Sequence, residues 1–199
     1  MVRSAKRWGG ENDKPDKASK KEKVDVVPLN TDKLESATTN RVDFNRGIIV
    51  RLINAIIKGE TLTVISTLEE EETLASSVDD QGRNLLVHAC FYDRFCIARV
   101  LRGFEVDVDR ADRRGFTPLH AACMTSKNPE LFNYLVRQGA SIYAVTSLGR
   151  TILHVAARKG NVVGIRFALS QGMDVDVRAG VGDDTRLTPL ALAFAFLRF

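Results

Sequence analysis

The sequence predicts an all-α fold made of repeated helical units, and three observations support this prediction. Gly82, Gly115 and Gly149 lie 33 and 34 residues apart. Each glycine opens a similar block, and the three blocks read GRNLLVHAC, GFTPLHAAC and GRTILHVAA. The chain has 199 residues, of which 44% are apolar, and this suffices for one domain with a continuous core. A period of this length is typical of stacked helix pairs that bury their apolar faces against one another.

Within each block, the residue types suit a turn followed by two helices. Glycine permits a tight turn, and Thr117 and Thr151 can accept a backbone N–H bond at the start of the first helix. Pro118 suits the first helical turn, where no backbone N–H is needed. Gly139 and Gly172 follow the second helices and suit a left-handed end there. The expected interior consists of small residues that allow close approach and of leucines: Ala89, Ala122, Ala156, Leu86, Leu119 and Leu153.

The most regular block contains Thr117-Pro118-Leu119-His120 followed by Ala122, and it resembles the ankyrin signature T-P-L-H-x-A. This resemblance implies an all-α ankyrin-repeat solenoid of four repeats plus a truncated fifth. It also implies a role in protein–protein interaction. The ankyrin-repeat domain is placed at 46–199, with repeats at about 46–80, 81–112, 113–146, 147–182 and, in part, 183–199.

Both ends of the repeat array depart from the pattern. The first repeat, 46–80, lacks a regular opening and is expected to cap the array. After an insertion around Val181 to Asp184, Thr188-Pro189-Leu190 restarts the pattern, but no second helix follows. The last helix would then expose apolar side chains that terminal repeats normally replace by polar ones: Phe194, Phe196 and Phe199. The sequence therefore predicts a truncated isoform or a fragment.

Residues 1–45 differ sharply in composition from the repeats. Residues 1–40 contain nine Lys or Arg and seven Asp or Glu, with few large apolar side chains. Such a segment cannot bury enough apolar surface to offset the entropy lost on ordering. We expect a disordered tail that precedes the repeat domain.

A short motif, Arg41-Val42-Asp43-Phe44, stands directly before the first repeat. Its order is a basic residue, a β-branched apolar residue, any residue and an aromatic one. Alternate side chains of a strand face the same way, so Val42 and Phe44 would enter neighbouring apolar pockets of a partner while the backbone pairs with a sheet edge. The pattern taken alone is also compatible with an ordinary linker contact.

The order of this motif and the ankyrin repeats resembles the myosin phosphatase targeting subunits, the regulatory subunit 12 family of type-1 protein serine/threonine phosphatase. Gly47, His88-Ala89-Cys90 and the junction QGASIYAVTSLGRT match the family as well. Lys6-Arg7-Trp8 looks like the end of a second docking motif, although Ser4 and Ala5 depart from its usual start.

This resemblance implies a regulatory subunit that binds the phosphatase catalytic subunit through Arg41, Val42, Asp43 and Phe44, with a second contact at Lys6, Arg7 and Trp8. The implied substrates are phosphorylated myosin light chain or other phosphoproteins. The implied location is cytoplasmic and cytoskeleton-associated.

Charge and composition disfavour several other classes of protein. The net charge of +4 comes from 29 basic and 25 acidic residues, a balance that does not indicate nucleic-acid binding. Three cysteines without regular spacing favour a reduced, intracellular protein, and we expect no secretion signal. The longest apolar stretch, Leu187 to Phe199, is too short to cross a bilayer as a helix. We therefore expect no membrane span.

An enzyme or a metal protein is disfavoured by the spacing of the candidate residues. His88, His120 and His154 recur once per repeat, so they lie along a rod, whereas zinc ligands converge on one point. We interpret them as packing or turn residues. The sequence has no glycine-rich phosphate-binding loop and no strand-turn-helix motif that could present a catalytic nucleophile. The prediction is a regulatory subunit that has no catalytic residue, cofactor or metal of its own.

The expected partner-facing set on the concave face is basic and aromatic, and it suits an acidic tail or substrate: Arg83, Tyr92, Arg110, Arg113, Arg114, Phe116, Met124 and Arg150. Solvated turn residues are the alternative for each of them taken singly. The alternative function is a generic ankyrin-repeat interaction adaptor without phosphatase binding, in which residues 1–44 are a linker. The lysines between 20 and 23 would favour a nuclear adaptor instead.

Overall fold

The computed structural model describes residues 46–180 and 187–196. Within these ranges the regular structure is helical, with one isolated bridge that joins Val78 and Asn84. The predicted tail at 1–45 and the insertion at Val181 to Asp184 lie outside the described residues. The prediction of an all-α fold is confirmed for the part of the chain that the structure covers.

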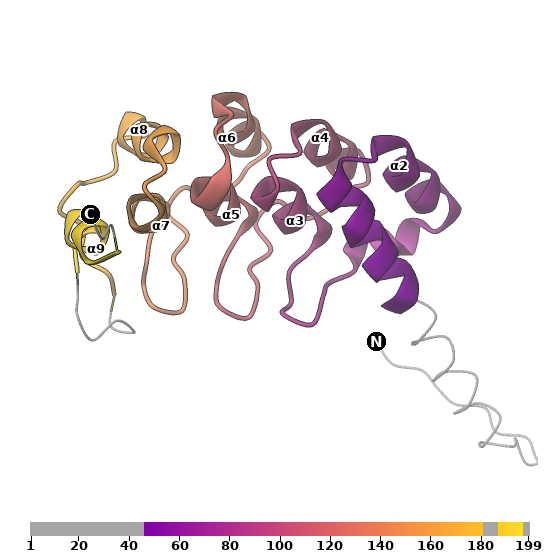
Figure 1. Ribbon diagram of the computed structural model, residues 1–199, viewed down its shortest axis with the longest axis horizontal. Coiled ribbons are helices and arrows are strands. Elements are labelled where there is room, and N and C mark those ends of the chain that lie inside the picture. The colour runs from indigo at the N-terminus through magenta and orange to yellow at the C-terminus, as the bar shows by residue number, and fades with distance from the viewer. Residues whose placement is uncertain (1–45, 181–186, 197–199) are drawn as a thin grey trace, which may run out of the picture. The chain divides into compact units, whose positions relative to one another are not determined.

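The helices come in pairs along the chain (Figure 1). A helix over residues 46–58 and α2 (Thr61–Glu70) form the first pair, and the 3-10 turn η1 (Glu72–Ser76) follows them. The later elements have these bounds: α3 Leu85–Phe91, α4 Phe95–Gly103, α5 Pro118–Thr125, α6 Pro129–Arg137, α7 Ile152–Lys159, α8 Val162–Ser170 and α9 Pro189–Phe196.

First and second helices of the pairs form two layers. The inner layer runs through α3, α5, α7 and α9, each of which packs against the next, while α4, α6 and α8 form the outer layer (Figure 1). The loops that join one pair to the next project on the inner side as fingers. None of the helices in the described ranges has the length and apolar character needed to cross a bilayer.

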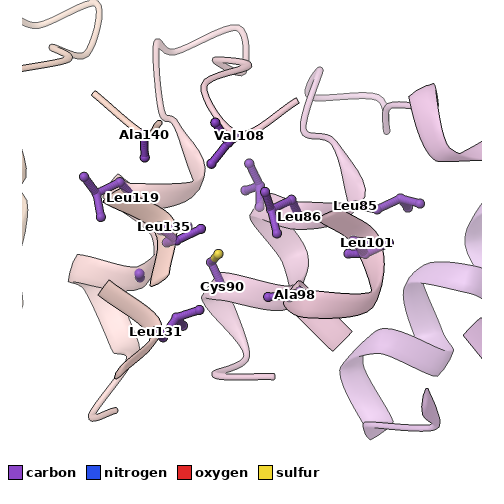
Figure 2. Packing of buried hydrophobic residues seen from close by; sticks show 14 of the residues in the cluster. Leu85, Leu86, Cys90, Ala98, Leu101, Val108, Leu119, Leu131, Leu135 and Ala140 are labelled. Atoms are coloured by element: carbon purple, nitrogen blue, oxygen red, sulfur yellow. The ribbon is translucent and has the colours of Figure 1, made fainter. Parts of the chain in front are cut away.

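The core lies between the two layers and between neighbouring pairs (Figure 2). Its leucines and alanines are the predicted ones: Leu86, Leu119, Ala89, Ala122 and Ala156 are 0% exposed, and Leu153 is 2% exposed. Alanine at these places leaves room for the next inner helix, and leucine fills the space between the layers. Each buried leucine contributes on the order of 2 kcal/mol.

Fingers of neighbouring repeats are joined by backbone hydrogen bonds. The N–H of Arg113 donates to the carbonyl of Gln81 at 3.0 Å, and the N–H of Ser147 donates to that of Arg114 at 2.8 Å. Gly149 takes φ +66°, and a Cβ there would lie 2.2 Å from the backbone nitrogen of Gly180. The turn glycine is therefore required both by its conformation and by the approach of the next finger.

Helix ends also follow the predicted chemistry. The Thr117 hydroxyl caps α5 by accepting from the backbone N–H of His120. The predicted left-handed glycines are observed at Gly139 with φ +97° and at Gly172 with φ +79°. Asn161 caps α8 and donates to the carbonyls of Cys123 and Ser126, at 3.1 and 2.9 Å. A cap of one repeat thus also holds the preceding repeat in place.

The last described helix, α9, is apolar on its exposed side as well as on its buried side. Leu192 is 1% exposed and faces the core, whereas Leu190 and Phe194 are 65% and 69% exposed. Phe199 and the side chain of Phe196 are not described. The predicted exposure of Phe194 is confirmed.

Candidate functional site: an inner groove

A groove of about 380 Å³ runs across the inner layer, between the helix over 46–58, α3 and α5. We call it the inner groove. Its lining combines apolar residues with a few charged ones: Ile53, Ile57, Asp79, Arg83, Val87, His88, Phe91, Tyr92, Asp112, Arg114, Phe116, Ala121 and Met124.

The floor of the inner groove is apolar and comes from the first helices of three successive pairs: the helix over 46–58, α3 and α5. Ile53 and Ile57 lie one turn apart on the first helix, so they share a face. Phe91 and Met124 come from α3 and α5, and both are only half-buried. Phe91 also packs edge-on against Tyr92, with ring centroids 5.2 Å apart. The floor therefore leaves apolar surface accessible along the whole groove.

A charged network centred on Asp79 forms one rim. One Asp79 oxygen accepts the backbone N–H groups of Gln81 and Arg83, at 2.8 and 2.9 Å. The other oxygen accepts from the Arg83 guanidinium at 2.8 Å and lies 3.0 Å from Nε2 of His88. Burial raises the pKa of Asp79, but the Arg83 and Gln81 N–H groups and the Arg83 charge outweigh it and lower the pKa. Asp79 is therefore an ionised carboxylate with both oxygens occupied.

His88 lies in the same network and is neutral at pH 7. Burial and the Arg83 charge lower the pKa of His88, and the Asp79 carboxylate offsets only part of that shift. Because the ionised Asp79 can only accept, Nε2 of His88 carries the proton that it donates to Asp79. His88 thus fixes the rim of the inner groove through Asp79.

His120 and His154 occupy a different position. Nδ1 of His120 lies 2.9 Å from the Thr117 hydroxyl, and its Nε2 lies 3.3 Å from the carbonyl of Arg150. Nδ1 of His154 lies 2.9 Å from the Thr151 hydroxyl, and its Nε2 lies 3.1 Å from the carbonyl of Leu187. Both rings are 0% exposed and connect one repeat to the next. They are turn residues, as interpreted from the sequence.

The second rim comes from the next finger. One oxygen of Asp112 accepts the backbone N–H groups of Arg114 and Phe116, both at 2.8 Å. This loop closes like the Asp79 loop, but its tip carries an arginine that is exposed to solvent, Arg114. Phe116 continues the apolar floor and packs against the ring of His120, with centroids 5.5 Å apart.

Five of the eight residues predicted for the concave face line the inner groove: Arg83, Tyr92, Arg114, Phe116 and Met124. The other three lie elsewhere. Arg110 lines a separate hollow with Glu72 and Phe104, and the Arg113 side chain lies next to Gly82 at the fingertips. Arg150 belongs to the following finger, where its backbone bonds to Thr146. The role of all eight as partner contacts stays a prediction.

The predicted docking motifs, Arg41-Val42-Asp43-Phe44 and Lys6-Arg7-Trp8, lie outside the described residues. Eight residues of the groove were not among the predicted contacts: Ile53, Ile57, Asp79, Val87, His88, Phe91, Asp112 and Ala121. The two isoleucines could have been found, because each follows a buried residue of the first helix and they are four positions apart. The position of His88 in the groove could not have been predicted, because the sequence gives His88 the same interpretation as His120, a packing or turn residue.

The cysteines do not belong to the groove. Burial raises the pKa of the Cys90 and Cys123 thiols, and both side chains are 0% exposed. Cys96 is exposed on α4 in the outer layer. No group of three potential metal-ligating side chains occurs within residues 46–180 and 187–196. What the groove itself offers is apolar surface, guanidinium groups and a neutral histidine.

Comparisons with known proteins agree with this architecture. The family model "Ankyrin repeats (3 copies)" matches residues 52–146 and 122–197. Palmitoyltransferase AKR1 of Saccharomyces cerevisiae is 31% identical over 93 residues, and Rabankyrin-5 of Homo sapiens is 32% identical over 89 residues. These stretches cover 46% and 45% of this chain but only 12% and 7% of the two relatives.

Protein phosphatase 1 regulatory subunit 27 of Mus musculus is also similar. It is 33% identical over 87 residues, which cover 44% of this chain and 56% of that protein. The family model spans well over half of the chain, and its matches coincide with the helix pairs described above. The chain therefore belongs to the ankyrin-repeat family and carries a protein-interaction domain.

Proposed function

We propose that the chain is a regulatory subunit that binds the catalytic subunit of type-1 protein serine/threonine phosphatase. The observation that carries this proposal is the position of Arg41-Val42-Asp43-Phe44, which ends two residues before the first helical residue that the structure describes, 46. A strand-like docking motif joined directly to a rigid repeat domain would hold the phosphatase in a defined place beside that domain.

Similarity to a known regulator supports the proposal. The relative named Protein phosphatase 1 regulatory subunit 27 shares 33% identity over 87 residues with this chain. The resemblance to the myosin phosphatase targeting subunits, which rests on the motif and on the junction residues, favours the same class of partner.

The proposed mechanism is docking and redirection. Val42 and Phe44 enter a surface channel of the phosphatase away from its catalytic centre, and Arg41 contacts the acidic rim of that channel. Burial of the two apolar side chains contributes about 1.5 to 3 kcal/mol each, hence roughly two to four decades of affinity. Catalysis stays with the partner, and this chain supplies no catalytic residue or cofactor.

The repeats supply the second surface. In the sequence, Phe44 precedes Ile53, which lines the inner groove, by nine positions. A substrate held in the groove of a chain that also binds the phosphatase would be tethered to that phosphatase, so its effective concentration would rise. Phosphorylated myosin light chain or another phosphoprotein, in the cytoplasm and at the cytoskeleton, is the proposed target.

Calorimetric titration of the purified phosphatase catalytic subunit into the full chain tests this proposal. The double variant Val42→Ala with Phe44→Ala should bind at least about a hundredfold more weakly than the unchanged chain. Helical circular dichroism should be identical for the two, since both positions precede the helices. Arg166→Glu, at an exposed position of α8 in the outer layer, is a control on the repeats and should bind as well as the unchanged chain. The proposal would be contradicted if the double variant and the unchanged chain bound the phosphatase catalytic subunit with equal affinity.

A generic ankyrin adaptor remains the second candidate, because AKR1 and Rabankyrin-5 share the repeats and their names do not indicate phosphatase regulation. The two candidates differ in the role of residues 1–44. If the chain is a generic adaptor, removal of those residues leaves its partners unchanged. If it is a phosphatase regulator, the same truncation removes the catalytic subunit from the proteins that co-purify with the chain.

A further inference from the structure

We propose that the inner groove binds a short peptide segment of a partner protein that combines apolar side chains with an aspartate or glutamate. The apolar side chains would lie on the floor between the first helix, α3 and α5, and the carboxylate would meet Arg114 at the fingertip edge. This inference deepens the proposed function by describing the second surface, but it does not depend on phosphatase docking.

The first argument is the apolar, accessible floor. Ile53, Phe91 and Met124 are only half-buried although they come from three different helices, and Tyr92 is 38% exposed at the end of the groove. A volume of about 380 Å³ is at the lower end of the range of ligand pockets, so it suits a few side chains of a peptide. Burial of such side chains would release water from both surfaces.

The second argument is the direction of the charges. The groove is lined by two carboxylates and two guanidinium groups, Asp79, Asp112, Arg83 and Arg114, so its formal charges cancel. The carboxylates nevertheless face the loop backbones, because each accepts two backbone N–H groups. The Asp79 side chain is 14% exposed, compared with 41% for Arg83. The charged groups that are accessible to a partner in the groove are therefore mainly the guanidinium groups.

Arg114 is the more available of the two arginines. Arg83 is already engaged by Asp79 through Nε and Nη2. Arg114 is exposed, and its guanidinium is in no ion pair with another residue of the described ranges. A guanidinium at the edge of an apolar groove matches a carboxylate on a segment whose other side chains are apolar. This charge complementarity favours an acidic peptide over a basic or a neutral one.

Selection from a phage-displayed library of random 12-residue peptides on the immobilised full chain tests the inference. The enriched peptides should share apolar residues and at least one Asp or Glu. The best peptide is then synthesised and titrated by calorimetry into the chain and its variants. Arg114→Glu should weaken it at least about tenfold, as expected for the loss of a charge-assisted hydrogen bond. Replacing the peptide's acidic residue by lysine should restore binding to Arg114→Glu and reduce binding to the unchanged chain.

Matched controls separate the groove from the rest of the surface. Arg166→Glu makes the same charge reversal at an exposed position of α8 in the outer layer, which does not line the groove, and it should leave the affinity within about twofold. Tyr92→Ala should weaken the peptide, whereas Tyr143→Ala, at a 73% exposed position away from the groove, should not. Both tyrosines are exposed, so neither change should unfold the chain.

The outcomes are distinct for the two proposals. The Val42→Ala and Phe44→Ala variant should bind the selected peptide as tightly as the unchanged chain, even if it no longer binds phosphatase. The inference is overturned if the selected peptides lack acidic residues, if Arg166→Glu weakens their binding as much as Arg114→Glu, or if the library yields no enriched peptide.

Discussion

His88 in the second repeat and His120 in the third differ by one position in their helices, and this difference separates a groove residue from a core residue. His120 is the third residue of α5, counted from its N-cap Thr117, and it bonds to that cap and to the next finger. His88 is the fourth residue of α3 after Asn84, and it bonds to Asp79 at the groove rim. A shift of one position turns a helical side chain by about 100°.

Asn84 explains why the second repeat tolerates this shift. Its side-chain oxygen caps α3 by accepting the Val87 N–H at 2.9 Å, and its amide donates to the carbonyl of Asp107 at 2.7 Å. In the third repeat, Thr117 caps the helix and His120 bonds to the following loop. In the second repeat Asn84 makes both of these contacts, so His88 is not needed for either and lies at the groove. The departure from the family signature coincides with the surface that we assign to binding.

The largest expected difference is in stability. His120→Ala removes bonds to the Thr117 hydroxyl and to the Arg150 carbonyl in a fully buried place, so we expect a loss of about 2 to 4 kcal/mol in the free energy of unfolding. His88→Ala should cost about 1 kcal/mol, because Asp79 keeps Arg83 and two backbone N–H groups. Urea unfolding followed by circular dichroism measures both values. Equal losses would mean that the two histidines have the same structural role.

The pH dependence of stability sharpens the same comparison. Burial lowers the pKa of His120 to about 4, partly offset by the Arg150 carbonyl and by Asp112 and Asp109, whereas the ordinary value is 6.5. Below pH 6.5 the His120 side chain binds a proton in the unfolded chain but stays neutral in the folded chain. The stability that the unprotonated His120 contributes to the fold is therefore complete above pH 6.5 and is lost as the pH falls towards 4. The expected loss is on the order of 3 kcal/mol.

His120→Gln isolates this contribution, since glutamine does not titrate. The difference in unfolding free energy between pH 7 and pH 4.5 should be smaller for the variant than for the unchanged chain. All other titrating groups are present in both proteins, so the difference between the two proteins reports the substitution at His120. An identical pH dependence would show that His120 does not account for the acid sensitivity.

The smallest expected effect concerns the asparagine. Asn84→Thr keeps a capping oxygen but loses the bond to Asp107, so it should cost about 1 kcal/mol. Asn84→Ala loses both bonds and should cost about twice as much. Thermal unfolding of the two variants measures the difference, and a threonine variant as unstable as the alanine variant would contradict the double role of Asn84.

Sequence periodicity predicted most of the fold because each repeat satisfies the same local rules. Positive φ at Gly82, Gly115 and Gly149, the cap at Thr117 and the buried leucines all follow from residue type at a fixed spacing. The candidate site was predicted only in part. Its charged and aromatic residues lie on fingers and inner helices, whose direction the repeat pattern gives.

The remaining groove residues depend on contacts between repeats that no single block specifies. Helical spacing places Ile53 and Ile57 on one face of the first helix, but the irregular opening of the first repeat does not specify their partners on α3 and α5. His88 required knowledge that Asn84 takes over the bond to the next loop. The Asn84 amide donates to the carbonyl of Asp107, 23 residues further along the chain, and no single block of sequence specifies a contact at this separation.

The central claim is that partners bind at the inner groove, where His88 lies, while His154 in the fourth repeat only holds the array together. Because the chain has three histidines, their ring signals can be followed one by one by NMR in protein labelled with ¹⁵N-histidine. Addition of the selected acidic peptide should shift the His88 ring signals most and leave those of His154 unchanged. A His154 shift as large as that of His88, or an unmoved His88, would contradict the account.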